Sequence, residues 1–397
     1  MITKLLFLVV AGLPILTARG QSYKKIHDHA IVIDGHNDIL TAGVDSAYSF
    51  DTNLSSKAQS DLQRMKRAGI DVQVFSVWCD GDKKNAFSYA NQQIDTLYAW
   101  VKRNPTKMKF VFTPGDLEKS VRQKELGAMI GIEGGHMIEN DLNKLDSFYK
   151  RGVRYMTLTW NKTLPWASSA RDETRNTVPN PKKGLNDLGR QIVRRMNELG
   201  MMIDISHLGE QSFWDVVSIT TKPVMASHSC VYNLCPVYRN LKDEQIKAIA
   251  KSGGVILINF YPGFLDSNWQ RKADEFDNRH KQEEDSVTKL SDETTMVHYL
   301  YSKYPAQMHE IDLVPIKLVI DHIDYIVKLV GVDYVGLGSD FDGMDDISQG
   351  LEGNGVLDFP KITNALLERG YKKEDIKKIL GGNFIRVFKS NSNVGSQ

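Results

Sequence analysis

The sequence predicts an α/β protein that forms one (β/α)8 TIM barrel. Eight short apolar runs have the length and composition of buried strands, and the segments between them are long enough for helices. Four of these runs end in a histidine or a carboxylate, as expected where the strands of a barrel deliver metal ligands to one rim. The 397 residues, 41% of them hydrophobic, suffice for a large core in a single domain.

Strands and helices alternate along the chain. We expect the eight strands at 31–36, 70–78, 128–133, 153–160, 201–207, 223–229, 254–260 and 334–340. Apolar residues recur at helical spacing over 185–199, and Gly200 ends that pattern. Further helices are expected at 243–251 and 315–330, each closed by a glycine soon afterwards.

The first twenty residues differ from the rest of the chain. Lys4 precedes an apolar run, and the small residues Ala18 and Gly20 occupy the −3 and −1 positions of a cleavage site. This pattern is typical of a signal peptide at 1–20, followed by a secreted or periplasmic protein at 21–397; a buried N-terminal helix is the alternative. The run is too short and too interrupted for a membrane span, and we expect none in the mature chain.

Charge and cysteine content exclude several classes of protein. A formal net charge of +1 gives no sign of a nucleic-acid or membrane-surface partner. Cys79, Cys230 and Cys235 form neither a disulfide framework nor a zinc motif, so we expect them to be small buried side chains. The segment 262–313 is long, charged and poor in strand signals. We interpret it equally as a solvated helical insertion in the domain or as a lid or dimer contact over the barrel mouth.

Five candidate metal ligands lie at the predicted strand ends. His36 and Asp38 are two residues apart, so an extended backbone points both to one side. Glu133, His207 and His228 end three further strands. Five nitrogen and oxygen ligands are too many for one catalytic zinc, but they suit two metals that share Glu133, with His36 and Asp38 on one and His207 and His228 on the other. A hydroxide between two metals ~3.5–4 Å apart would attack a carbonyl carbon.

Asp340 ends the eighth predicted strand and is the candidate acid/base. A carboxylate beside two cations stays ionised, can take the proton of the bridging water and can pass it to a leaving amine. The alternative is a strand-end carboxylate held by backbone hydrogen bonds. Asp342 is expected to serve the Asp-Gly turn. We expect Asp204 to orient a metal-bound imidazole, and His136 to be a structural or orienting histidine rather than a sixth ligand.

Six short motifs accompany these residues. They are His36-Asn37-Asp38, Glu133-Gly134-Gly135-His136, Ile203-Asp204-Ile205-Ser206-His207, Ser227-His228-Ser229, Arg239-Asn240 and Gly338-Ser339-Asp340-Phe341-Asp342-Gly343. Together they resemble the membrane (renal) dipeptidase family of metallopeptidases, over about residues 25 to 388. The resemblance implies a barrel with two Zn²⁺ ions that hydrolyses free dipeptides, often with a C-terminal D-residue and in some members β-lactams as well. It also implies a possible homodimer.

The resemblance assigns roles to individual residues. It implies Asp340 as the catalytic acid/base, Glu133 as the bridging catalytic ligand and Arg239 as a group that binds the substrate carboxylate. At Trp160 the chain departs from mammalian members, which carry a histidine that steadies the oxyanion there. Indole donates one hydrogen bond but carries no charge, so Trp160 and Asn161 are both candidate substrate-binding residues, while packing of the pocket wall is the alternative for Trp160.

Cysteine usage adds to the comparison with that family. Cys79 and Cys235 lack the partners that form disulfides in mammalian members. Together with the missing anchor signal, this favours a soluble, bacterial-type secreted member.

Two other functions remain open at this point. A different amidohydrolase-like barrel, such as a lactonase, phosphotriesterase, β-lactam hydrolase or deaminase, would in many cases carry a lysine between the metals. None of the candidate residues at the strand ends is a lysine. A non-catalytic secreted peptide-binding barrel would have lost a ligand or Asp340, and all six residues are present. A zinc-dependent dipeptidase using a metal-bridging hydroxide is therefore the main prediction.

Overall fold

The computed structural model describes residues 23–175, 183–288, 299–344 and 350–393. The predicted signal peptide at 1–20 lies outside the described residues. Eight parallel strands follow one another in the order β1-β2-β4-β5-β6-β7-β8-β10. Their bounds are β1 Ile33–Asn37, β2 Val72–Trp78, β4 Leu126–Glu133, β5 Val153–Thr157, β6 Met202–Asp204, β7 Met225–Ala226, β8 Val255–Ile258 and β10 Val335–Leu337.

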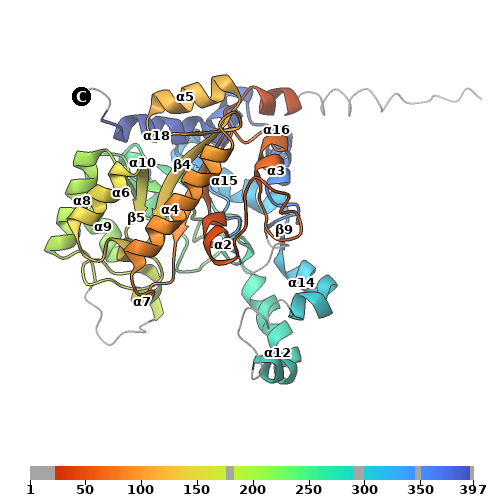
Figure 1. Cartoon of the computed structure of the whole chain (residues 1–397). Coiled ribbons are helices and arrows are strands. Elements are labelled where there is room, and N and C mark those ends of the chain that lie inside the picture. Colours follow the sequence, from red (N-terminus) through yellow and green to blue (C-terminus); the bar gives the residue numbers. More distant parts are fainter. Residues whose placement is uncertain (1–22, 176–182, 289–298, 345–349, 394–397) are drawn as a thin grey trace, which may run out of the picture.

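The barrel closes where β1 meets the chain just after β10. The backbone N–H of Asp340 donates to the carbonyl of His36 at 3.2 Å, and that of Asp38 donates to the carbonyl of Phe341 at 2.9 Å. These bonds join the first strand to the last at the rim that carries the candidate ligands. The predicted (β/α)8 class is confirmed, with helices around the barrel (Figure 1).

Strands β6 and β7 are shorter than predicted because the side chain of Asp204 binds backbone groups just after each of them. The carboxylate of Asp204, the last residue of β6, accepts hydrogen bonds from the backbone N–H groups of Ser206 at 3.1 Å and Ser227 at 2.8 Å. These side-chain bonds take the place of ladder bonds between the two strands, so regular pairing ends there. A further short strand that we did not predict, β3 Met108–Phe110, pairs with the start of β4.

Helices lie between successive strands on the outside of the barrel (Figure 1). They are α2 Ile39–Asp45, α3 Leu62–Arg67, α4 Ala86–Arg103, α5 Pro114–Gln123, α6 Leu142–Lys150, α7 Ala170–Arg175, α8 Asp187–Leu199, α9 Glu210–Ile219, α10 Asp243–Lys251, α15 Ile316–Val330, α16 Phe359–Glu368, α17 Lys373–Lys377 and α18 Asn383–Asn391. The three helices expected from sequence are α8, α10 and α15. Asn186 caps α8 by accepting from the N–H of Gly189 at 3.1 Å, and Gly200 ends it with φ of 79°.

Helix α18 covers the end of the barrel opposite the candidate ligands. Phe384, Val387 and Phe388 pack with the apolar side chains of the strands. Arg386 donates to the carbonyl groups of Gly254 at 2.9 Å and Asp333 at 2.6 Å, which precede β8 and β10. The end of the barrel at the N-terminal ends of the strands is thus filled and closed. A functional site is therefore expected at the opposite rim, where the strands end.

The charged segment after β8 is helical and projects from the barrel (Figure 1). It contains α11 Pro262–Leu265, α12 Trp269–Thr288 and α14 Pro305–Asp312. Phe276, Leu300 and Ile311 form a small apolar cluster of its own. The segment ends in β9 Leu313–Val314, which pairs with β11 Gly350–Leu351 and so attaches the segment to the chain that follows β10. Among the described residues, no helix is long and apolar enough to cross a membrane.

Candidate active site

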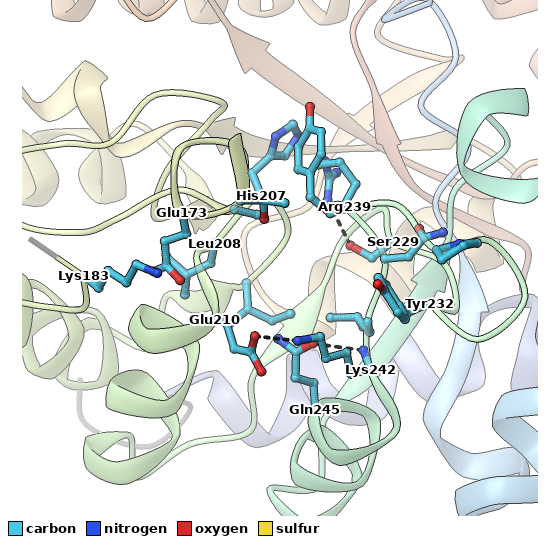
Figure 2. Close-up of a pocket in the computed structure, with 17 residues that line it drawn as sticks. Glu173, Lys183, His207, Leu208, Glu210, Ser229, Tyr232, Arg239, Lys242 and Gln245 are labelled. Atoms are coloured by element: carbon cyan, nitrogen blue, oxygen red, sulfur yellow. Dashed lines mark hydrogen bonds and ion pairs between the residues drawn. The ribbon is translucent and has the colours of Figure 1, made fainter. Parts of the chain in front are cut away.

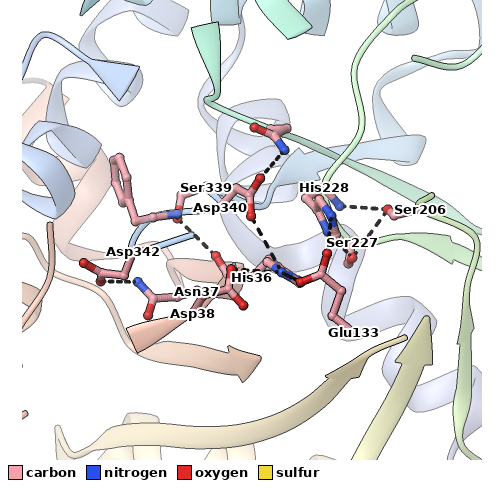
Figure 3. Close-up of polar contacts among 12 residues, drawn as sticks. His36, Asn37, Asp38, Glu133, Ser206, Ser227, His228, Ser339, Asp340 and Asp342 are labelled. Atoms are coloured by element: carbon pink, nitrogen blue, oxygen red, sulfur yellow. Dashed lines mark hydrogen bonds and ion pairs between the residues drawn. The ribbon is translucent and has the colours of Figure 1, made fainter. Parts of the chain in front are cut away.

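The five candidate ligands converge at the rim of the barrel. Figure 3 shows His36, Asp38, Glu133 and His228 together with Asp340. His36 lies in β1 and Glu133 is the last residue of β4, whereas His207, His228 and Asp340 follow β6, β7 and β10. His207 and Asp340 have φ of 62° and 64°. This left-handed conformation is uncommon for residues with a side chain and is frequent at functional sites. It turns the chain sharply just after two of the strands.

Glu133 lies between two groups of imidazoles. Its Oε1 is 2.9 Å from Nε2 of His207 and 3.5 Å from Nε2 of His228. Its Oε2 is 3.3 Å from Nε2 of His36. Because the two oxygens of one carboxylate face different histidines, Glu133 has the placement of a ligand shared by two metals.

The ligand atoms form overlapping groups that fit divalent metals. The sets His36–Asp38–Glu133 and Glu133–His207–His228 each bring their ligand atoms within 4.8 Å of one another. Oδ2 of Asp38 is 3.4 Å from Nε2 of His36, and Oδ1 of Asp38 is buried with no hydrogen-bond partner in the part of the chain that the structure describes. A buried carboxylate oxygen without a donor is costly unless a cation completes its environment. The donor set therefore fits the two metals expected from the sequence.

Burial sets the protonation of these groups. It lowers the pKa of His207 to about 4, and that of His228 well below its usual value, so both imidazoles are neutral at neutral pH. Burial would raise the pKa of Glu133, but hydrogen bonds from the three imidazoles hold it well below its usual value. Neutral imidazoles and an ionised carboxylate are the states in which these side chains bind metals.

His36 differs from the other two imidazoles. Burial opposes its charged form, yet Tyr155, Asp38 and Glu133 together raise its pKa well above the usual value. A metal at Nε2 would displace that proton, because ligation requires the lone pair.

Each imidazole is held on its other nitrogen by a different side chain. Nδ1 of His36 is 2.7 Å from the hydroxyl of Tyr155, and Nδ1 of His207 is 3.0 Å from Oδ1 of Asn161. Such partners orient the rings so that Nε2 faces the carboxylate of Glu133 and the rest of the ligand cluster. Sequence reasoning missed Tyr155; the available signal was a polar aromatic side chain within a buried strand, whose hydroxyl needs a partner. Asn161 was expected to meet substrate, and the structure turns its carbonyl oxygen to His207.

His228 is held by a hydroxyl that a carboxylate supports in turn. Nδ1 of His228 is 2.7 Å from Oγ of Ser227, and that hydroxyl lies 2.5 Å from Oδ2 of Asp204. Asp204 was expected to orient a metal-bound imidazole. The structure places it behind Ser227, so any such effect passes through the serine hydroxyl.

Asp340 faces the ligand cluster from the other side. Its Oδ1 lies 3.8 Å from Nε2 of His36, and its Oδ2 accepts from Nδ2 of Asn259 at 2.8 Å. Its side-chain contacts are thus with an amide side chain and an imidazole rather than with backbone N–H groups. Burial raises the pKa of Asp340 to about 7. Asn259, which the sequence analysis did not single out, is the residue that fixes its orientation.

Asp342 has a structural environment, in agreement with its expected place in a turn. Its carboxylate accepts from the backbone N–H of Gln59 at 2.6 Å, from the hydroxyl of Ser60 and from Nδ2 of Asn37 at 3.0 Å. It thereby attaches the loop around Gln59 to the end of β1.

A cavity of about 380 Å³ opens beside Glu133, Asp38 and Asp340. Its remaining lining residues are Thr41, Trp78, Trp160, Asn161, His207, Tyr261, Phe264, Asp342, Gly343 and Met344. The rings of Trp78 and Trp160 meet edge to face with centroids 5.2 Å apart. Trp160 therefore forms part of the cavity wall, together with Trp78, which the sequence analysis did not identify.

Arg239 borders a second cavity of about 230 Å³, which also reaches His207 (Figure 2). Its guanidinium is buried and donates to the carbonyl of His228 at 3.1 Å, while its Nε is buried without a partner. It lies over the ring of Phe264, 5.1 Å from the centroid, and Phe264 lines the larger cavity. The structure thus places the buried guanidinium of Arg239 next to the candidate metal ligands, where an anionic group could reach it.

The remaining candidates lie outside the ligand groups. Nε2 of His136 is 3.4 Å from Sγ of Cys79, and His136 belongs to none of the clusters of possible ligands found among the described residues. Cys79, Cys230 and Cys235 are all buried and free. Burial raises the pKa of the Cys79 thiol to about 12 and that of Cys235 to about 11, so neither is a reactive thiolate at neutral pH.

Known proteins resemble this chain over nearly its whole length. Residues 20–397 match the model of the membrane dipeptidase family, peptidase family M19. Dipeptidase 3 of Mus musculus is 28% identical over 377 residues, which are 94% of this chain and 66% of that protein; the chain thus spans just under two thirds of this relative.

Solved structures share the fold. The probable dipeptidase PvdM from Pseudomonas aeruginosa has a TM-score of 0.79 and 25% identity, covering 94% of this chain and 98% of that one. A metallopeptidase from Rhodobacter sphaeroides, solved with a phosphinate mimic of the dipeptide L-Ala-D-Ala, has a TM-score of 0.73 and 22% identity, covering 91% of this chain and 100% of that one. With nearly the whole chain matched, this protein belongs to the membrane dipeptidase family, a family of peptide-bond hydrolases.

Proposed function

We propose that this protein is a dipeptidase that uses two zinc ions to hydrolyse free dipeptides. The observation that carries the proposal is the placement of Glu133, whose two carboxylate oxygens face separate imidazole groups. Membership in the dipeptidase family supports the same activity. Neither a barrel with a single metal nor a non-catalytic peptide-binding barrel has a need for a carboxylate placed in this way.

His36, Asp38 and Glu133 would hold one ion, and Glu133, His207 and His228 the other. Imidazole and carboxylate donors suit zinc, although the donor types alone do not exclude manganese or cobalt. When bound, such a pair of ions supplies Lewis acidity at the scissile carbonyl and lowers the pKa of water.

Asp340 is the proposed proton carrier. It would accept a proton from the attacking water as the C–O bond forms, and it would deliver that proton to the nitrogen as the C–N bond breaks. The hydrogen bond from Asn259 leaves Oδ1 of Asp340 directed at the ligand cluster. Burial gives Asp340 a pKa near neutrality in the free protein, and nearby cations would lower it, which favours the ionised base at the start of a cycle.

Arg239 is the proposed anchor of the substrate carboxylate. Its charge interacts with Asp340 and Glu133, and its buried Nε has no partner. A carboxylate that pairs with this guanidinium would offset the cost of burying the cation. A free α-amino group near the metals, together with the carboxylate at Arg239, would restrict the substrate to two residues, as membership in the dipeptidase family implies. Because Arg239 would contact the carboxylate rather than the C-terminal side chain, we include dipeptides that end in a D-residue.

We also propose that the protein acts in the periplasm or outside the cell, because the first twenty residues have the pattern of a signal peptide. Expression of the full chain in a bacterial host, followed by N-terminal sequencing of the exported protein, tests this. We expect the exported chain to begin at Gln21. An intact N-terminus on cytoplasmic protein would contradict it.

Hydrolysis by purified, zinc-reconstituted protein tests the proposed activity. We would compare L,L and L,D dipeptides with a dipeptide blocked at both ends, alongside a chelated sample and Asp340→Asn, and measure bound zinc in each. Cleavage of free dipeptides only, lost in both controls, and about two zinc ions per chain are expected. Two bound ions without turnover of any dipeptide would favour another amidohydrolase-like activity, and no metal at all would favour a binding protein.

A further inference from the structure

The cavity of about 380 Å³ beside Glu133 is lined by both polar and aromatic side chains. One side carries the groups of the ligand cluster, namely Asp38, Glu133, His207 and Asp340. The aromatic lining residues lie at two places: Trp78 and Trp160, which we call the aromatic wall, lie at the end of β2 and just after β5, whereas Tyr261 and Phe264 follow β8. A cavity with reactive groups on one side and apolar groups on the other can select the side chain of its substrate.

The aromatic wall is held in place by its own contacts. Trp78 and Trp160 meet edge to face, and Tyr261 meets Phe264 in the same way with centroids 4.9 Å apart. Tyr261 also packs against Trp269, whose indole N–H donates to Asp312 at 3.0 Å. The base of the projecting helical segment therefore supports the end of the cavity formed by Tyr261 and Phe264. Rigid aromatic surfaces of this kind favour large apolar side chains.

Among the described residues, one carboxylate lines the cavity outside the ligand cluster. Asp342 lines the cavity, but its oxygens already accept three hydrogen bonds from Gln59, Ser60 and Asn37. It has little capacity to bind a polar side chain, and it would repel an acidic one.

The barrel order indicates which residue of a dipeptide meets the wall. Trp78 ends β2 and Arg239 follows β7, and these two strands stand opposite each other in the strand order. With the substrate carboxylate at Arg239 and the peptide bond at the ligand cluster, the N-terminal residue extends toward β2. Phe264, which lies under Arg239, marks the other end of the cavity.

We propose that the aromatic wall selects dipeptides whose N-terminal residue has a large apolar side chain, such as leucine or phenylalanine. This inference rests on the proposed dipeptidase function and names its preferred substrates. Each buried methylene increases affinity by roughly fourfold, so a leucine that contacts the wall is favoured over alanine by about 50-fold when fully buried. An N-terminal aspartate is disfavoured because Asp342 and Asp38 face the same space.

Two substrate series test the proposal. In the first, the C-terminal residue is alanine and the N-terminal residue is glycine, alanine, leucine, phenylalanine or aspartate. In the second, the same residues occupy the C-terminal position after alanine. We expect kcat/KM to rise roughly 10- to 100-fold from Ala-Ala to Leu-Ala, and to vary less across the second series.

Variants of the wall connect the preference to the structure. Trp78→Ala is expected to reduce the ratio of kcat/KM for Leu-Ala over Gly-Ala by about tenfold, and Trp78→Phe to retain most of it. Trp214 lies on α9 away from this cavity and is 36% exposed, so Trp214→Ala is the matched control and leaves the ratio unchanged. Trp160→Ala provides a second wall variant if Trp78→Ala does not fold.

The outcomes separate the two proposals. Cleavage of Gly-Ala and Ala-Ala with no gain for larger N-terminal residues overturns the selection but leaves the dipeptidase function standing. A preference that follows the C-terminal residue overturns the proposed orientation. No cleavage of any dipeptide by the zinc-loaded protein overturns both.

Discussion

The hydroxyl of Tyr155 lies 2.7 Å from Nδ1 of His36, in the interior of the barrel. Tyr155 belongs to β5 and His36 to β1, so this contact crosses the barrel rather than joining neighbouring strands. It fixes the orientation of the His36 ring, a candidate metal ligand, from the interior of the barrel. The same hydroxyl also lies 3.4 Å from the carbonyl of Gly35.

Replacement of Tyr155 by phenylalanine should weaken metal binding without unfolding the protein. The change keeps the buried ring and removes only the hydroxyl, so Nδ1 of His36 loses its partner. Loss of such a partner typically reduces metal affinity by roughly 10- to 100-fold. Competition with a chromophoric chelator measures this. Tyr98→Phe is the control, because Tyr98 is exposed and its hydroxyl donates to the carbonyl of Arg151, far from the ligand cluster in the sequence. Equal zinc affinity in both variants would contradict the proposed role.

Gly131 is a glycine because of the same tyrosine. A Cβ at this position would lie 2.1 Å from Cζ of Tyr155. Gly131→Ala should therefore displace the ring and destabilise the protein by about 1–3 kcal/mol, the usual cost of overpacking a core. Urea denaturation would show a lower midpoint. Gly115→Ala is the control, since its nearest contact would be 3.6 Å away at Thr113. A stability of Gly131→Ala equal to that of the control would mean that Tyr155 relaxes freely.

Asp340 and Asp342 are close in sequence, but replacing Asp340 should mainly lower kcat and replacing Asp342 should mainly lower stability. Asp340→Asn removes the proposed proton carrier while retaining the hydrogen bond from Asn259, so kcat should fall by roughly 10²- to 10⁴-fold with zinc still bound. Asp342→Asn disturbs the bonds to Gln59, Ser60 and Asn37. It should lower stability by about 1–3 kcal/mol, with a smaller effect on kcat. Steady-state kinetics and thermal denaturation of both variants distinguish these roles; the reverse pattern would exchange the assignments.

The positions of the candidate ligands could be predicted because they depend on one rule. Side chains at the C-terminal ends of barrel strands meet at one rim, whatever the details of packing. His36, Glu133, His207 and His228 needed only recognition of the strands and of their direction. The division into two groups around Glu133 followed from the number of ligands.

The partners of those ligands could not be predicted in the same way. Tyr155 reaches His36 across the barrel, and Asn259 reaches Asp340 from a neighbouring strand end. Both contacts depend on the stagger and tilt of the strands, which the sequence of a single strand does not specify. Trp78 was missed for a related reason: it ends a run that reads as a uniformly buried strand, whereas in the structure it is half-buried and lines the cavity beside Trp160.

Side chains that replace backbone bonds limited the prediction of strand lengths. Asp204 binds the N–H groups of Ser206 and Ser227, so β6 and β7 end earlier than their apolar sequence indicates. The insertion presents a different limit. Its charged sequence predicts exposed helices. The contact between Trp269 and Tyr261, by which the segment supports the cavity, involves two aromatic residues near its start and leaves no pattern in the sequence.

His322 joins α15 to the loop that carries Arg239, and its protonation should affect stability. Its Nδ1 accepts from the backbone N–H of Val231 at 3.0 Å, so that nitrogen must be unprotonated. Its Nε2 lies 3.2 Å from the carbonyl of Leu265 and is therefore the donor. Burial lowers the pKa of His322 from 6.5 to about 4. The buried ring is thus neutral in the folded protein over a pH range in which the unfolded chain takes up a proton.

The stability contributed by neutral His322 should be complete above pH 6.5 and be lost as the pH falls from 6.5 to about 4, by up to about 3 kcal/mol. His322→Gln offers an acceptor and a donor that do not titrate, so its stability should decline less over this range. Urea denaturation of metal-free protein at several pH values gives the difference between the two proteins, and that difference removes the contribution of the other histidines. His29→Gln, at an exposed site, is the control and should follow the wild type. A parallel decline of wild type and His322→Gln from pH 7 to pH 4 would show that His322 is not the group responsible.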